Sequence, residues 1–111
     1  MTLGEWIPLY LTSYKQDTIK VNSYAMLKLA AEHIPQEMKE MELAAIMPMQ
    51  LQRFYNEFAK TYSKSYMDKV HTLLKGLFAA AVDNDLCEKN PTNKIRLPRI
   101  RETPRENFDM A

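Results

Sequence analysis

Apolar residues recur at helical spacing in four segments of the chain, and the first segment is residues 2–14. Its apolar stripe consists of Leu3, Trp6, Ile7 and Tyr10. Thr2, followed three residues later by Glu5, has the pattern of a capping box, which predicts a helix that begins at this threonine. Pro8 lies inside the stripe, so we expect the helix either to kink there or to start later.

A second helix is predicted to reach about His33. Asn22 and Ser23 are suitable N-cap residues for its start. Pro35 would end it, because the residue before a proline is pushed out of the helical region. Its buried face would consist of Leu27, Ala30, Ala31 and Ile34. The acidic, methionine-rich residues 36–47 that follow are interpreted as a loop with one helical turn.

The third predicted helix begins at Pro48, since proline suits the first turn of a helix. Its apolar stripe is Leu51, Phe54, Tyr55, Phe58 and Tyr62. The residues expected outside are Gln52, Arg53, Asn56 and Lys60. This separation of apolar and polar positions is typical of an amphipathic helix that packs on a core.

The fourth predicted helix is the longest. Ser63 or Ser65 would cap it, and it is expected to reach Asp85 or beyond, with Asn90-Pro91 closing the helical run. Its core face would be Met67, Val70, Leu74, Leu77 and Ala81, with Leu73 and Phe78 beside it. The side expected to face away holds Ser65, Asp68, Thr72, Lys75 and Ala79.

The composition agrees with one all-α domain. The chain has 111 residues, 46% of them hydrophobic, and its two glycines and lack of alternating strand patterns argue against a sheet. The single cysteine excludes an internal disulfide and fits a reducing compartment. No apolar run approaches the ~18 residues that span a bilayer, and the start does not resemble a signal peptide. We therefore expect a cytoplasmic location and no membrane partner.

The sequence offers little catalytic or metal-binding chemistry. His33, His71 and Cys87 are too scattered for a zinc site, and we interpret them as a helix-end residue, a packing or interface residue and a partly buried apolar residue. The acidic cluster of Glu37, Glu40 and Glu42 lacks the ligand spacing of a calcium loop, so a solvated face is the better interpretation. No cofactor, metal or catalytic residue is expected, and the chain alone is not expected to be an enzyme.

The formal net charge of +1 conceals an alternation along the chain. Residues 32–57 contain five acidic residues and two basic ones, whereas residues 58–75 contain four lysines and one aspartate. Folding can gather such basic segments on one side, which is compatible with nucleic-acid binding. The tail "KIRLPRIRE" (residues 94–102) is also basic, and it either meets phosphates or is a frayed terminus whose charges are solvated.

Three stretches in order resemble the N-terminal core-binding domain of tyrosine recombinases, the phage-integrase type with a SAM-like fold. They are "IKVNSYAMLKLAAEHIP", "LAAIMPMQLQRFYNEF" and "YSKSYMDKVHTLLKGLFAAAVDNDLCEKNPTNKIRLPR". The resemblance covers residues 3 to about 100. It departs from the family pattern in "EMKEMEL", where a glycine is common, and at Tyr66, where a threonine is common.

The resemblance implies a four-helix SAM-like orthogonal bundle that forms half of a clamp around double-stranded DNA. Residues 1–92 would be the DNA-binding domain, and residues 93–111 an interdomain linker to the catalytic domain of the same parent chain. The family's His-x-x-Arg element is not found after His33 or His71, so strand cleavage belongs to that other domain. The parent would be tetrameric on DNA and this part alone monomeric, acting in DNA integration and recombination for a phage, a mobile element or a chromosome.

The resemblance also implies that the second and fourth helices face the major groove. The DNA-binding candidates are Lys20, Asn22, Ser23, Tyr24, Lys28, Lys64, Ser65, Tyr66, Lys69, Thr72, Lys75, Lys94, Arg96 and Arg99. The lysines and arginines suit phosphates, and backbone N–H groups at a helix N-terminus favour the same ligand. Asn22 and Thr72 are candidates for base edges. For each lysine taken singly, an ordinary solvated role stays open.

One alternative belongs to a different functional class. The methionines Met38, Met41, Met47 and Met49 surround one loop, and together with the aromatic third helix they would suit a helical protein-interaction domain. The simpler interpretation is that these methionines fill gaps under a loosely built connection. Binding to DNA and the sequence beyond Ala111 would distinguish the two functions.

Overall fold

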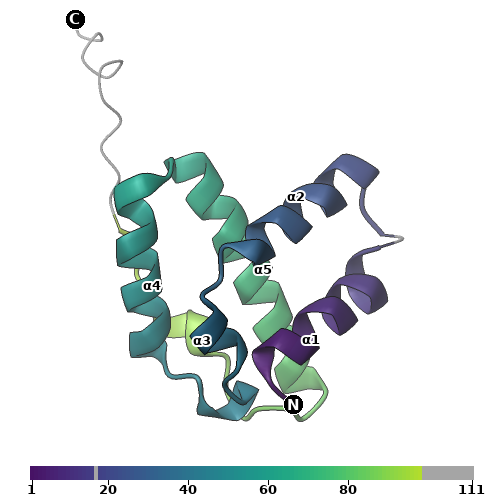
Figure 1. Cartoon of the computed structure of the whole chain (residues 1–111). Helices are drawn as coiled ribbons and strands as arrows, with labels where there is room; N and C mark the ends of the chain where they lie inside the picture. Colours follow the sequence, from purple (N-terminus) through teal and green to yellow (C-terminus); the bar gives the residue numbers. More distant parts are fainter. Residues whose placement is uncertain (17, 99–111) are drawn as a thin grey trace, which may run out of the picture.

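Helices joined by short connections form the part of the chain that the structure describes, residues 1–16 and 18–98 of a computed structural model. The order is α1 (Leu3–Tyr10), π-helical η1 (Leu11–Lys15), α2 (Val21–Glu32), α3 (Gln36–Lys39), 3₁₀ turn η2 (Leu43–Ala45), α4 (Pro48–Thr61), α5 (Lys64–Asp83) and 3₁₀ turn η3 (Pro91–Lys94). Figure 1 shows α5 between α4 on one side and the α1–α2 pair on the other. The predicted all-α fold with four main helices is confirmed.

The capping box at the start of α1 is present as predicted. The Thr2 Oγ1 atom accepts a hydrogen bond from the Glu5 amide at 3.2 Å, and the Glu5 carboxylate accepts one from the Thr2 amide at 2.9 Å. Pro8 lies within the helix without ending it, so the expectation of a later start is wrong. The helical path continues through η1 to Lys15, close to the predicted end.

The start of α2 differs from the prediction. Lys20 is the N-cap in an extended conformation and makes no side-chain capping bond, while Asn22 and Ser23 already lie in the first turn. Capping contributes about 1 kcal/mol, and α2 begins without it at Val21, which is 83% exposed. The end is as predicted: the helix stops at Glu32, His33 is its C-cap, and Ile34 is buried just before Pro35.

The connection between α2 and α4 is pinned to the N-terminus of the chain. The amide of Leu3 donates to the Met41 carbonyl at 2.9 Å, and the amide of Leu43 donates to the Met1 carbonyl at 3.0 Å. α3 and η2 supply the predicted helical turn and bury Met38 and Leu43. The Met-rich segment is therefore more ordered than a loosely built loop.

The predicted apolar stripes of α4 and α5 form the centre of the core. In α4 the buried residues are Leu51, Phe54, Tyr55 and Phe58. In α5 they are Met67, Val70, Leu73, Leu74, Leu77, Phe78, Ala80 and Ala81. Pro48 begins α4 and Ser63 caps α5, as the sequence predicts. The Trp6 indole donates to the Leu77 carbonyl at 2.8 Å, which ties α1 to α5 inside this core.

The end of α5 comes earlier than predicted. The helix stops at Asp83, and Asp85 takes a left-handed conformation with φ 60°. The Leu86 amide then donates to the Ala81 carbonyl and the Asp85 amide to the Val82 carbonyl, which is the bonding of a Schellman motif. Asn90-Pro91 therefore begins η3 and does not end the helix. Among the described residues, no helix is long and apolar enough to cross a membrane.

Candidate nucleic-acid interface

A groove of about 580 Å³ lies between the N-terminal end of α2 and the first half of α5. Five of the predicted DNA-binding residues line it: Asn22, Ser23, Ser65, Lys69 and Thr72. They come from two helices that are more than 40 positions apart in the sequence. α2 and α5 pack directly on one another, so this juxtaposition is a property of the fold.

The groove combines an apolar floor with polar walls. Ile19, Met26 and Leu27 provide apolar surface, and Lys15 and Lys69 provide positive charge. Asp68 is the acidic residue among the lining residues, and its carboxylate pairs with the Lys64 ammonium at 3.1 Å. Both members of this pair are largely exposed. Lys64 partly neutralises this carboxylate, which would otherwise oppose an anion in the groove.

Three other predicted residues lie on α2 beside the groove and do not line it. Lys20 is the exposed N-cap of the helix. Tyr24 is half-buried against the core, and the Lys28 ammonium lies over its ring, 5.7 Å from the centroid. This cation–π contact holds the Lys28 head group next to the helix.

Tyr66 turns away from the groove and joins an aromatic cluster. The centroid of the Tyr66 ring lies 5.1 Å from the ring centroid of His33, 5.6 Å from that of Phe58 and 5.5 Å from that of Tyr62. Partial burial raises the pKa of the Tyr66 hydroxyl. The cluster joins the end of α2 to the α4–α5 connection, so Tyr66 has a packing role that the sequence did not predict.

The remaining predicted cations lie at the other end of α5. Lys75 and Lys94 share a shallow depression with Lys89, two asparagines and the acidic residues Asp83 and Glu88. Arg96 is exposed on the segment that follows η3. Arg99 lies outside the described residues. The candidates therefore form two surfaces: the α2–α5 groove and the region where the described chain ends.

Tyr55, which is buried on α4, contacts the partly buried His71 on α5. The Tyr55 hydroxyl and His71 Nδ1 are 2.8 Å apart. Burial raises the pKa of Tyr55 and, together with nearby Lys75, lowers the pKa of His71. Both groups therefore favour their neutral forms, and the imidazole tautomer sets which of the two donates the hydrogen bond. Burial also raises the pKa of the Cys87 thiol, which favours its neutral form.

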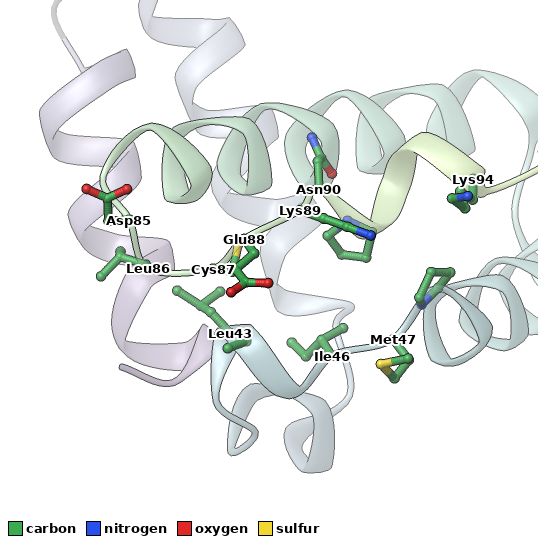
Figure 2. Close-up of a pocket in the computed structure, with 13 residues that line it drawn as sticks. Leu43, Ile46, Met47, Asp85, Leu86, Cys87, Glu88, Lys89, Asn90 and Lys94 are labelled. Atoms are coloured by element: carbon green, nitrogen blue, oxygen red, sulfur yellow. The ribbon is translucent and has the colours of Figure 1, made fainter.

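A second pocket, of about 560 Å³, lies between the α3–α4 connection and the segment after α5. Figure 2 shows Leu43, Ile46 and Met47 on one side and Leu86 and Cys87 on the other. Met47 is 59% exposed.

Across the residues that the structure describes, no group of His, Cys, Asp and Glu side chains could hold a metal ion.

Sequence reasoning missed several residues of the groove. Lys15, Ile19 and Met26 line it although none was a candidate. Lys15 carried a usable signal, because it is a base at the end of the first predicted helix, next to the α2 N-terminus along the chain. The apolar floor carried no such signal, since its residues look like ordinary core positions.

Comparison with known proteins places these observations in context. A family model described as "Phage integrase, N-terminal SAM-like domain" matches residues 2–59. The solution NMR structure of a phage integrase SAM-like domain from Moorella thermoacetica is similar in fold, with a TM-score of 0.67 and 21% sequence identity. The likeness covers 94% of this chain and 91% of that one, so it includes α5. No curated protein matches the sequence.

Proposed function

This chain belongs to the family of phage integrase N-terminal SAM-like domains, and we propose that it binds double-stranded DNA as the core-binding half of a tyrosine-recombinase clamp. The observation that carries the proposal is the α2–α5 groove, which gathers five polar or basic candidates on two adjacent helices. A catalytic domain of the same parent chain would supply strand cleavage and exchange. The parent would act as a tetramer on DNA in the cytoplasm, and this domain alone would be a monomer.

Phosphate contact accounts for most of the expected affinity. Lys15 and Lys69 lie in the groove, and Lys20 lies at the N-terminus of α2, the positive end of the helix dipole. Each phosphate neutralised by a lysine releases counterions, so affinity should fall steeply with salt. These contacts position the domain without reading sequence.

Base contact is assigned to short polar side chains in the groove. Asn22 and Thr72 are exposed and lie on opposite walls, one on α2 and one on α5. An asparagine can bond the adenine edge, and a threonine can contact several edges or the thymine methyl group. The two residues are accordingly our candidates for sequence preference, with Ser65 beside them.

Residues 93–111 are proposed to act as the linker that crosses DNA between the two halves of the clamp. Lys94, Arg96 and Arg99 would meet phosphates there, together with Lys75 on α5. The depression shared by Lys75 and Lys94 supports this grouping.

Fluorescence anisotropy with a labelled random-sequence duplex, across a salt series, tests the proposal. The wild-type chain should bind weakly, and Lys69→Ala should reduce the slope of log K against log salt by about 0.9. Lys60→Ala is the matched control, because Lys60 is exposed on α4 and pairs with Glu57 at 3.2 Å, away from the groove. Absence of binding at low salt, or equal effects of both variants, would contradict the proposal.

Protein interaction is the second candidate, and one observation favours it. Met47 and Met49 are 59% and 70% exposed, and Met47 lines the pocket of Figure 2. Exposed methionines suit adaptable protein contacts. Met47→Ser with Met49→Ser should leave DNA affinity unchanged under the first proposal. The protein-interaction function would be supported if the wild-type chain did not bind DNA and the double substitution abolished binding to a protein partner.

A further inference from the structure

The side-chain amide of Gln52 on α4 holds the backbone of Arg96. Its Nε2 donates to the Arg96 carbonyl at 2.7 Å, and its Oε1 accepts from the Arg96 amide at 2.9 Å. The second Nε2 hydrogen is directed to Asn56 Oδ1, 3.2 Å away, one helical turn further on. The amide therefore has partners for both its donor and its acceptor groups. The Gln52 amide makes the same pair of hydrogen bonds with the Arg96 backbone that a residue of a neighbouring β-strand would make.

A second anchor lies six residues earlier, at Asn90. Its Oδ1 accepts from the Thr92 amide at 3.0 Å and from the Thr92 hydroxyl at 2.6 Å. Its Nδ2 donates to the Lys75 carbonyl on α5 at 3.2 Å. Thr92 is only 4% exposed and Pro91 is buried beside it. This end of the segment is thus fixed to α5.

Between the two anchors the segment packs on the bundle. Ile95 is half-buried against the core, and η3 contacts both α4 and α5. The side chains of Lys94 and Arg96 remain exposed. Residues 90–96 therefore have a fixed backbone with free cationic side chains, which a frayed terminus would not have.

We propose that Gln52 and Asn90 are positioning residues, which fix the path of residues 90–96 so that Lys94 and Arg96 are held ready for phosphate contact. Residues 93–96 would then be the anchored start of the proposed linker, packed on the helical domain. Ordering a segment before binding reduces the entropy that binding must otherwise overcome. The DNA part of this inference rests on the proposed function, whereas the anchoring itself does not.

Amide hydrogen exchange by NMR tests the anchoring without DNA. The Arg96 amide should be protected at least tenfold in the wild-type chain. Gln52→Ala should remove this protection while the amides of the α5 core keep theirs. Gln52→Glu keeps the acceptor but loses the donor, so its Arg96 protection should be intermediate. Gln36→Ala, at an exposed glutamine on α3, is the matched control and should change nothing at Arg96.

An unprotected Arg96 amide in the wild-type chain, or unchanged protection in Gln52→Ala, would overturn the anchoring. The DNA part is tested by anisotropy on the same duplex. Because ordering one residue costs about 1–2 kcal/mol, Gln52→Ala should weaken binding about five- to thirtyfold. Its salt slope should stay unchanged, since the cations are still present.

The anisotropy measurement distinguishes failure of the positioning proposal from failure of the proposed function. Unaltered affinity in a Gln52→Ala chain that has lost Arg96 protection would overturn the positioning role in DNA binding. A wild-type chain that does not bind DNA would contradict the proposed function, and the exchange measurement would still decide the anchoring.

Discussion

The two halves of α5 have different surroundings. In the first half, up to Thr72, only Met67 and Val70 are buried, and the exposed side borders the groove with α2. In the second half, the buried residues are Leu73, Leu74, Leu77, Phe78, Ala80 and Ala81. One helix thus presents a candidate binding surface at its start and a core surface at its end. Stability and binding should therefore respond to different substitutions along the same element.

The core half is tied to α1 by two close contacts. The Trp6 indole donates to the Leu77 carbonyl at 2.8 Å. Gly76 lies one residue before Leu77, and the Tyr10 hydroxyl lies where a Cβ atom on residue 76 would be. The glycine therefore permits close approach of α1 and α5. Both contacts lie in the half of α5 that has no part in the groove.

The largest expected effect is that of Leu77→Ala, because Leu77 is fully buried at the centre of the core. Truncating such a leucine leaves a cavity and should lower the free energy of unfolding by about 2–5 kcal/mol. Thr72→Ala, in the exposed half, should change it by no more than about 0.5 kcal/mol. Urea denaturation followed by circular dichroism measures both. Similar losses for the two variants would contradict the division of α5.

Gly76→Ala should have the next largest effect. Forcing the Tyr10 hydroxyl aside should cost about 1–3 kcal/mol, partly offset by the ~1 kcal/mol better helix propensity of alanine. In a Tyr10→Phe background the obstructing oxygen is gone and the nearest ring carbon is 3.4 Å from the Cβ position. The same glycine substitution should then stabilise the chain. Thermal unfolding of the wild-type chain, the two single variants and the double variant tests this. An equal loss of stability in both backgrounds would refute the steric explanation.

The positions of most helices could be predicted from the sequence, because apolar periodicity and capping residues are local signals. The end of α5 could not, since its Schellman motif has Asp85 in the left-handed position where glycine is the usual signal. The N-cap of α2 was also misplaced, because Asn22 and Ser23 suit the cap by residue type but lie in the first turn.

The candidate site was predictable where its residues lie on exposed helix faces. The sequence identified Lys69 and Thr72 in this way, and the groove contains both. It could not identify Gln52, because the partner of this side chain is 44 residues away and is a backbone group of ordinary appearance. The aromatic contacts of Tyr66 were missed for a related reason, since its partners His33 and Phe58 come from the end of α2 and from α4.

A smaller effect should appear on lowering the pH. Burial, with a contribution from Lys75, lowers the pKa of His71 below its ordinary value of 6.5, and Asp68 opposes the shift. The unfolded chain therefore binds more protons just below pH 6.5, so this contribution to stability is complete above pH 6.5 and is lost as the pH falls. His71→Asn can still accept the Tyr55 hydrogen bond but does not titrate. Its unfolding free energy should fall less than that of the wild-type chain between pH 7 and pH 5, and parallel curves would refute the assignment.

The smallest change in stability is expected for Asp68→Asn, which also sharpens the contrast between the halves of α5. The lost ion pair with Lys64 is exposed, so the unfolding free energy should fall by only about 0.3–0.5 kcal/mol. DNA affinity should rise about two- to threefold at low salt, because a carboxylate no longer opposes phosphates in the groove. Glu57→Gln, which breaks the exposed Lys60 pair on α4 instead, controls for the change in net charge. An equal gain in affinity for both variants would mean that total charge governs binding, and the groove would lose its special role.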